Sequence, residues 1–329
     1  MRALSSALLA LLILPTHAPP GGSRPAAAIP AADHAASATF AGFRVKFNDH
    51  VSPYRVMAVF TMPRERVDLE IVDARRGRRF RVEATAGPVT AREARRWRWE
   101  SPEGQGVYRI RILQLDPPDT MTLNAFVMVP FGRVRNGYLN GYRIGEYPST
   151  PLKHLPIYRR PRGFVEVTPE NRATLVSPHF RLGDFLCKQS AGWPRYLVLH
   201  ERLLLKLELV LQRTNEAGYD ATSFRILSGY RTPYYNHLIG NVRYSRHIFG
   251  DAADIYIDER PPDGMMDDLD RNGHIDYRDA GVLYDLIDHL YAESWYTPFV
   301  GGLGRYQKTR SHGPFVHVDT RGFRARWGT

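Results

Sequence analysis

The sequence predicts two folded parts in succession: an all-β domain of the small β-sandwich type over residues 40–131, and an α+β domain over residues 164–329. Two observations lead to this division. In the first part, apolar residues alternate with polar ones in several short runs, which is the period of a half-buried strand. The second part combines a Leu-rich run of helical spacing with strand-like runs. With 329 residues, of which 43% are hydrophobic, the chain is long enough for two cores.

The N-terminus has the pattern of a secretory signal. Met1 and Arg2 precede an apolar run from Ala3 to Leu14, which Pro15 closes. The run is too short to span a membrane, which takes about 20 apolar residues. We predict a signal peptide over residues 1–28, with several small residues open as cleavage sites, and a disordered tether over residues 29–39. The mature protein is then expected in the periplasm or outside the cell, without a transmembrane segment.

Four alternating runs define the first domain. They consist of Val67, Leu69 and Ile71; of Phe80, Val82 and Ala84; of Tyr108, Ile110 and Ile112; and of Leu123, Ala125, Val127 and Val129. Turn signals such as Arg76-Gly77-Arg78 and Pro117-Pro118 separate the runs, which is the spacing of short strands in a sandwich.

Between the domains, residues 132–163 are rich in Gly, Tyr and Pro and are predicted to be an extended connector. Beyond it, Leu204, Leu207 and Leu211 share one face of a predicted helix, and such a stripe is typical of a core. The only cysteine, Cys187, cannot form an internal disulfide and is expected to be a buried, inert thiol.

Two strings near the C-terminus carry residues suited to a metal. They are Ser245-Arg-His247-Ile-Phe-Gly250-Asp-Ala252-Ala-Asp254 and His312-Gly-Pro-Phe-Val-His317-Val-Asp319. His247, Asp254 and His317 offer three nitrogen and oxygen donors, which bind zinc and leave one position open. Gly250 permits a sharp turn that would bring His247 back beside Asp254. Alternation around His317 predicts a strand with His317 and Asp319 on one face.

These strings resemble the zinc D-Ala-D-Ala carboxypeptidases and related murein peptidases. The signature of that family is Ser-x-His-x-x-Gly-x-Ala-x-Asp, followed far downstream by a His-Val-Asp strand, and Ser228-Gly-Tyr-Arg231 is similar to a further element of the family. The resemblance extends from about Phe164 to Trp327 and implies an α+β peptidase domain with a central antiparallel sheet. It implies that His247, Asp254 and His317 hold zinc.

The resemblance also suggests roles for the neighbouring residues. Arg231 would polarise the scissile carbonyl or hold a substrate carboxylate, although a salt bridge is the alternative. Many family members carry an acidic base where this chain has Pro314, so His312 becomes the candidate for acid/base chemistry, against the alternative of a surface histidine. Ser245 and Asp319 are expected behind the ligands, where Asp319 would orient a ligand histidine or Arg231; a structural role is the alternative for Asp319.

A second metal signal lies inside this domain, in a predicted insertion over residues 261–290. Its residues follow the calcium-loop rule, with Gly273 at the sixth position and Asp279 instead of the usual Glu at the twelfth. The predicted calcium ligands are Asp268, Asp270, Asn272, His274, Asp276 and Asp279. Pro261 and Pro262 stand where an entering helix would be, so a loop with only its exiting helix is predicted. We expect a structural clamp for the insertion over the zinc site; an acidic turn without metal is the alternative.

The net charge of +11 favours an anionic partner. Outside the cytoplasm that partner would be peptidoglycan or another anionic envelope polymer, and no motif supports nucleic-acid binding. The first hypothesis is an exported zinc metallopeptidase that hydrolyses D,D or L,D bonds in peptidoglycan stem peptides or crosslinks, as a carboxypeptidase or an endopeptidase. The second is a non-catalytic wall-binding protein stabilised by zinc and calcium, which Pro314 supports. The role of the first domain and the oligomeric state stay open.

Overall fold

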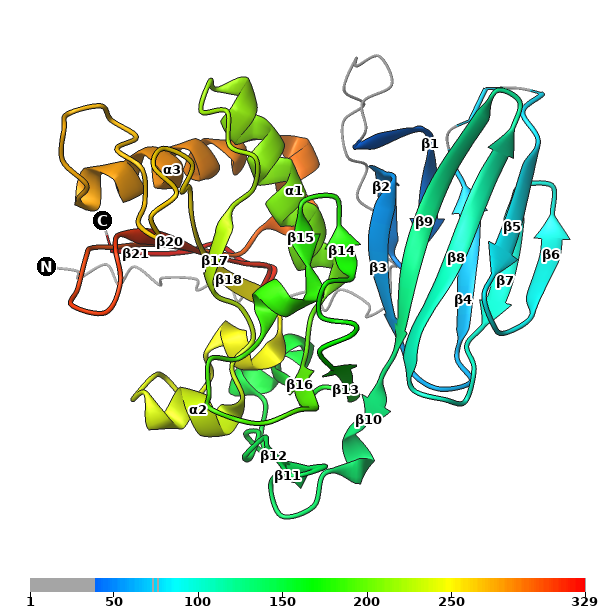
Figure 1. Ribbon diagram of the computed structural model, residues 1–329, viewed down its shortest axis with the longest axis horizontal. Helices are drawn as coiled ribbons and strands as arrows, with labels where there is room; N and C mark the ends of the chain where they lie inside the picture. The colour runs from blue at the N-terminus through cyan, green and yellow to red at the C-terminus, as the bar shows by residue number, and fades with distance from the viewer. Residues whose placement is uncertain (1–38, 73, 76, 329) are drawn as a thin grey trace, which may run out of the picture.

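The computed structural model describes residues 39–328 except residues 73 and 76 (Figure 1). The predicted signal peptide and nearly all of the predicted tether lie outside the described residues. Within the described part, no helix is both long enough and apolar enough to cross a membrane.

The first region is β-rich, as the sequence predicts, and contains two sheets. One has the strand order β2-β1-β4-β7-β6 and the other β3-β9-β8-β5, and all their pairings are antiparallel except β3 with β9. Phe43 of the first sheet packs edge-on against Phe80 of the second, with ring centroids 5.1 Å apart. The strands are β1 (Phe40–Phe47), β2 (His50–Tyr54), β3 (Val56–Thr61), β4 (Arg66–Ile71), β5 (Phe80–Ala84), β6 (Val89–Glu93), β7 (Arg96–Glu100), β8 (Gly106–Leu115) and β9 (Pro118–Val127).

The four alternating runs of the sequence correspond to β4, β5, β8 and the β9 segment with its continuation, β10 (Val129–Pro130). Five further strands of this region were not predicted. In β1, the buried residues Phe43, Val45 and Phe47 do alternate, so that signal was present. In β6, four of five residues are exposed, because this strand lies at a sheet edge and offers no apolar pattern.

The segment over residues 132–163 has more local structure than the predicted extended connector. It contains the short helices η1 (Phe131–Arg133), η2 (Leu152–His154) and η3 (Pro156–Tyr158), and a hairpin of β11 (Tyr138–Leu139) and β12 (Tyr142–Arg143). Asn140 and Gly141 join the two strands with φ values of 48° and 81°. An Asn-Gly pair is the strongest short signal for such a turn, because both central residues need positive φ.

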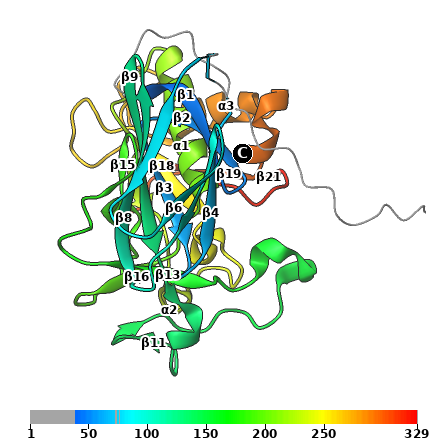
Figure 2. The ribbon, with the colours of Figure 1, turned by 90° about the vertical axis from the view of Figure 1, so that its right-hand side faces the viewer.

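The C-terminal region is built on one five-stranded sheet of order β17-β18-β20-β19-β21. Its pairings are antiparallel, as expected, except that β19 and β21 run parallel. Helices α1 (Glu201–Glu216) and α3 (Tyr277–Leu290) lie on one side of this sheet and α2 (Pro233–Leu238) on the other (Figures 1 and 2). The strands are β17 (Arg225–Ser228), β18 (Ala252–Tyr256), β19 (Gly302–Tyr306), β20 (Phe315–Asp319) and β21 (Ala325–Trp327).

Shorter elements complete this region. The three-stranded sheet β10-β13-β16 links it to the first region through the β10–β13 pairing. The remaining elements are β13 (Gly163–Val167), β14 (Leu175–Ser177), β15 (Phe180–Arg181), β16 (Arg195–Leu197), η4 (Leu182–Phe185), η5 (Arg246–Phe249) and η6 (Ser294–Phe299).

Helix α1 contains the predicted Leu-rich helix and lies between the two halves of the molecule. Glu201 accepts hydrogen bonds from the Phe60 backbone and the Asn48 side chain, both in the first region. On its other side, the fully buried Lys206 donates to the carbonyls of Phe299 and Asp319. A buried ammonium is tolerated only when its donors find acceptors, so these bonds fix α1 against the end of β20.

Candidate metal centre

The register of the central sheet brings the predicted residues into one row. Asp254 pairs directly with Ser228 on one side and with His317 on the other. His317 in turn pairs with Gly304, and Gly304 with Trp327. Residues opposite each other on neighbouring strands share a face of the sheet. The row therefore places one carboxylate and one imidazole side by side on two adjacent, rigid strands.

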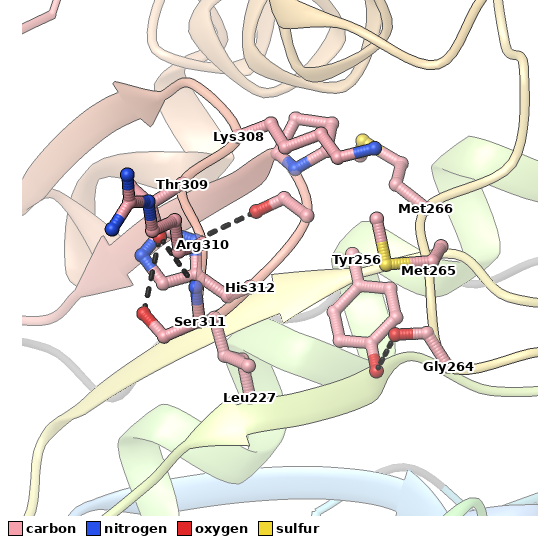
Figure 3. Close-up of a pocket in the computed structure, with 12 residues that line it drawn as sticks. Leu227, Tyr256, Gly264, Met265, Met266, Lys308, Thr309, Arg310, Ser311 and His312 are labelled. Carbon is pink, nitrogen blue, oxygen red and sulfur yellow. Dashed lines mark hydrogen bonds between the residues drawn. The ribbon is translucent and has the colours of Figure 1, made fainter.

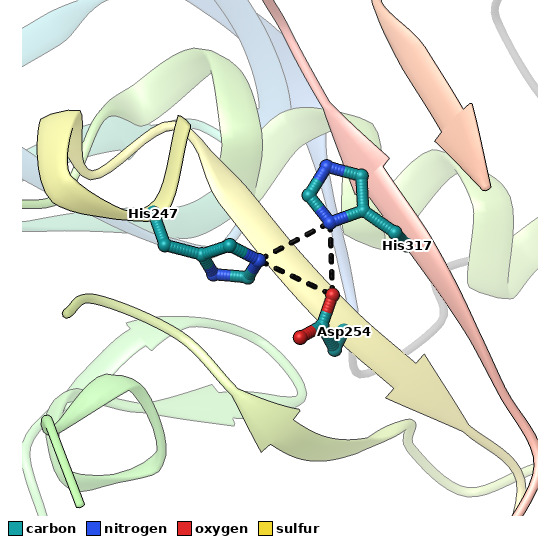
Figure 4. Close-up of side chains that lie close together, drawn as sticks. All are labelled: His247, Asp254 and His317. Atoms are coloured by element: carbon teal, nitrogen blue, oxygen red, sulfur yellow. Dashed lines mark hydrogen bonds and ion pairs between the residues drawn. The ribbon is translucent and has the colours of Figure 1, made fainter. Parts of the chain in front are cut away.

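The third donor comes from outside the sheet. His247 lies in η5, which ends at Gly250 in the left-handed conformation with φ 77°. A Cβ at Gly250 would lie 2.3 Å from the carbonyl oxygen of Val198, so both the conformation and the space require glycine here. The predicted turn is thus present. It returns the chain so that His247 faces Asp254 and His317 (Figure 4).

The turn is held by a buried ion pair that the sequence analysis did not single out. Arg246 donates to both carboxylate oxygens of Asp251 and to the carbonyl of Ile157. Arg246 and Asp251 flank the turn, and both are almost completely buried. A bidentate pair fixes geometry as well as energy. Ser245, just before the helix, is buried and lines the same groove as His247.

Three donor atoms converge on one point. Asp254 Oδ1 lies 2.8 Å from His317 Nδ1 and 3.2 Å from His247 Nε2, and the two histidine nitrogens are 3.1 Å apart (Figure 4). Atoms bound at about 2.0–2.1 Å to a tetrahedral zinc lie roughly 3.3 Å from one another. The spacing of the three donors therefore fits a zinc site after a small outward adjustment.

The opposite atom of each donor residue is already engaged. His247 Nδ1 donates to the carbonyl of Gly229 at 2.7 Å, and His317 Nε2 donates to Asp319 at 3.1 Å. Asp254 Oδ2 accepts from Arg231 at 2.6 Å. These contacts leave His247 Nε2, His317 Nδ1 and Asp254 Oδ1 as lone-pair atoms that face each other. Such an arrangement is repulsive unless a cation, either a metal or an added proton, lies between them.

The electrostatics of the three residues agree with this picture. Burial lowers the pKa of His247, an effect that Asp254 opposes and Arg231 reinforces. Burial alone would also lower the pKa of His317, but hydrogen bonds and charges from Asp254 and Asp319 outweigh it and the pKa is raised. For Asp254, burial would raise the pKa, yet the two histidines hold it well below its usual value.

The Ser-Gly-Tyr-Arg element supports the donors from behind. Ser228 accepts from Arg231 Nε at 2.8 Å, so it aims the guanidinium at Asp254. Gly229 supplies the carbonyl for His247, and a Cβ there would lie 2.6 Å from Phe185 Cα. Of the two interpretations of Arg231, the salt bridge is present in the structure, while its side chain also lines the groove.

Asp319 is fully buried and connects several elements. Besides accepting from His317, it forms an ion pair with Arg321 and accepts from the Gly302 backbone at 2.7 Å. Its pKa is held well below the usual value because His317 and Arg321 outweigh the effect of burial. The carboxylate thus fixes the tautomer of His317, which leaves Nδ1 toward the other donors.

The three donors lie at the floor of a groove of about 1040 Å³. Aromatic and basic residues that sequence reasoning missed line it as well. Trp327 packs against His317 with ring centroids 5.1 Å apart, and its indole nitrogen donates to Tyr306. This contact depends on Gly304, where a Cβ would lie 2.2 Å from the indole nitrogen. Further basic lining residues are Lys188, Arg243 and Arg321.

His312 lines the same groove but is outside the group of converging donors. Its ring packs edge-on against Phe315, with centroids 5.0 Å apart, and Nδ1 donates to the carbonyl of Gly313 at 2.8 Å. That bond leaves Nε2 as the atom able to accept a proton. Pro314 lines a second pocket next to this groove. Among the described residues that line the groove itself, Asp254 is the one with a carboxylate.

The second predicted metal site has a different character. Carboxylate oxygens of Asp268, Asp270 and Asp279 lie within 4.8 Å of one another, and α3 begins at Tyr277, so that Asp279 lies in the first turn of the helix. Asp276 caps this helix, and the described chain has no helix over residues 261–276. Several loop carboxylates accept backbone N–H groups: Asp268 from Asn272 and Gly273, and Asp279 from Leu269 and Asp276. His274 lies in the same loop, with its backbone N–H bonded to Asn272. The calcium site stays a prediction.

A comparison with known protein families supports the resemblance found in the sequence. A model of the family described as Peptidase M15 matches residues 178–278. The matched segment contains Arg231, His247 and Asp254, whereas His317 and Asp319 lie beyond its end. No curated protein matches the chain. For the C-terminal region, this match supports the resemblance to the zinc D-Ala-D-Ala carboxypeptidase-like M15 peptidases that the motifs indicated.

Proposed function

We propose that the protein is an exported zinc peptidase that hydrolyses peptide bonds in peptidoglycan stem peptides or crosslinks. One observation carries the proposal. His247, Asp254 and His317 present three lone-pair atoms to one point at the floor of a groove, while their opposite atoms are bound by Gly229, Arg231 and Asp319. This is the donor set of a catalytic rather than a structural zinc site, because three protein ligands leave one position open.

The residues of the groove suit amide hydrolysis. Zinc held by the three donors would supply a Lewis acid that polarises a carbonyl and lowers the pKa of water. Arg231 holds Asp254 in place and adds positive charge to the groove wall, where it would stabilise negative charge that develops on the carbonyl oxygen. His312 would accept a proton at Nε2 and deliver it to the leaving nitrogen.

The remaining features extend this proposal. Residues 40–131 would act as a separate domain that positions the peptidase domain of residues 164–329, with residues 132–163 as the connector. The N-terminal 28 residues would direct export and be removed. Calcium, held by the loop from Asp268 to Asp279, would fix the start of α3. The positive net charge would favour association with peptidoglycan and other anionic envelope polymers.

One observation favours a second function. No carboxylate other than Asp254 lines the groove among the described residues, and Pro314 occupies the place of an acidic base. A protein with this site could bind wall peptides through zinc without cleaving them. The two functions differ in turnover and agree in zinc binding.

Digestion of purified peptidoglycan with the zinc-loaded mature protein, followed by mass spectrometry of the fragments, tests the proposal. We expect new fragments that are absent with His247→Ala. The matched control is His289→Ala, because His289 is an exposed histidine of α3, on the other side of the sheet. Bound zinc without fragments would favour the binding protein, and equal fragments from His247→Ala would refute the metal centre.

A further inference from the structure

A second pocket adjoins the groove of the metal centre. Its volume is about 390 Å³, and three of its lining residues, Leu227, Ser311 and His312, also line the groove. The three donor residues do not line it. His312 therefore lies at the boundary between the groove and the pocket. The space available to a ligand continues past His312, away from the metal donors.

The two walls of this pocket differ in chemistry (Figure 3). One wall is the loop between β19 and β20, which carries Lys308 and Arg310. The opposite wall is formed by Tyr256 and Met265 with the neighbouring backbone. No acidic side chain lines the pocket among the described residues. A ligand with an apolar stem and a carboxylate fits such a pair of walls.

The loop that carries the two cations is closed on itself. Thr309 donates its backbone N–H to the His312 carbonyl at 2.9 Å, and its hydroxyl lies 3.1 Å from that of Ser311 (Figure 3). At the base of the loop, the rings of Tyr306 and Phe315 stack with centroids 4.5 Å apart. The loop is thus tied at both its tip and its base, which lowers the entropic cost of ligand binding.

The groove on the other side of His312 is also cationic. Lys188, Arg231, Arg243 and Arg321 line it, and its one carboxylate, Asp254, belongs to the metal donors. Positive side chains are therefore present both in the groove around the metal donors and in the adjoining pocket. Clefts lined by one sign of charge attract ligands of the opposite sign.

We propose that this pocket is a subsite for an acidic residue of the substrate, and that the protein binds an acidic peptide on both sides of the scissile bond. The protein is then an endopeptidase. This inference rests on the proposed hydrolytic function. In the reaction, water adds its hydroxyl to the carbonyl carbon, the C–N bond breaks, and the leaving nitrogen takes the proton. The pocket extends the binding region past His312, and an extended site suits a substrate that continues on both sides of the scissile bond better than the release of one terminal residue.

The test compares zinc-loaded wild type with Lys308→Ala/Arg310→Ala on crosslinked muropeptides, either native or with their carboxylates converted to amides. We expect the double variant to raise KM for native muropeptides about tenfold with unchanged kcat, because charge-assisted hydrogen bonds are lost. Amidation should raise KM strongly for the wild type and less for the double variant. Lys308→Arg/Arg310→Lys should restore the wild-type KM.

A matched control removes two exposed cations of the first domain, Arg92→Ala/Arg109→Ala, and should leave KM unchanged. Equal KM values for the double variant and this control would overturn the subsite. Release of a single terminal residue as the only product would overturn the endopeptidase assignment while the peptidase proposal survives. If no turnover occurs, the peptidase proposal fails, and calorimetry with the same muropeptides decides the subsite: weaker binding to the double variant supports it, and equal binding overturns it.

Discussion

Two clusters of potential ligands in the same region differ in how their donors are arranged. In the cluster of His247, Asp254 and His317, all three side chains are buried and their opposite atoms are already bonded, so the remaining lone pairs face one another. In the loop from Asp268 to Asp279, the carboxylates accept backbone N–H groups of the loop itself. The first cluster therefore requires a cation, whereas the second has a hydrogen-bonded structure without one.

Removing a donor of the buried cluster should have the largest effect. Asp254→Asn keeps the size of the side chain but takes away the charge that faces two histidines and Arg231. We expect zinc affinity to fall by more than about 100-fold, beyond the range of changes at residues behind a ligand. Competition with a chromophoric chelator measures this, with His289→Ala as the control. Undiminished affinity would show that the zinc binds elsewhere.

A smaller loss is expected from Asp319→Asn. The amide can still accept from His317, but it no longer compensates the charge of Arg321 in a buried position. Zinc affinity should fall by about 10–100-fold. The free energy of unfolding should fall by about 3 kcal/mol, because one partner of the buried Asp319–Arg321 pair loses its charge. Urea unfolding of the metal-free protein separates the two effects, and unchanged stability there would contradict the structural role of the pair.

The loop cluster should respond to calcium more weakly. If calcium binds and stabilises the folded state by about 1–2 kcal/mol, its selective removal at constant zinc lowers the melting temperature by about 4 °C. Asp268→Ala should abolish this response and leave zinc content unchanged. Identical melting curves with and without calcium would identify the loop as an acidic turn held by its own hydrogen bonds.

An imidazole and a carboxylate outside both clusters should behave as a simple ion pair. His179 Nδ1 lies 2.6 Å from Glu208, and that hydrogen bond is the main reason why the pKa of His179 is raised. The stabilisation is fully present below the unfolded pKa of about 6.5 and is lost as pH rises through the higher folded value. Glu208→Gln should flatten the stability profile in that range. NMR titration of His179 checks the direction, and a lowered pKa would contradict it.

The sequence was sufficient to find the buried cluster because each donor lies in a local pattern with its own geometric meaning. Gly250 marked the turn that returns His247, and alternation marked the strands of Asp254 and His317. Neither pattern, however, contains the register that sets Asp254 opposite His317 and Gly304 opposite Trp327. Such pairings depend on the whole sheet and could not be derived from local periodicity.

Other features were missed for different reasons. The Asn140-Gly141 hairpin was readable from its dipeptide and was overlooked. The carbonyl of Gly229 could not be predicted as the partner of His247, because a backbone acceptor leaves no mark in residue type. Lys206 occupies a position in a Leu-rich helix that the sequence suggests to be on the surface, and only tertiary packing shows its three acceptors.

X-ray absorption at the zinc edge, on the mature protein loaded with one equivalent of zinc, tests the central claim most directly. The account predicts a first coordination shell of nitrogen and oxygen at about 2.0–2.1 Å with the multiple scattering of imidazole rings, and its loss in His247→Ala. A shell of oxygen atoms without imidazole, or an unchanged spectrum for His247→Ala, would place the metal in the acidic loop or elsewhere and contradict the assignment of the buried cluster.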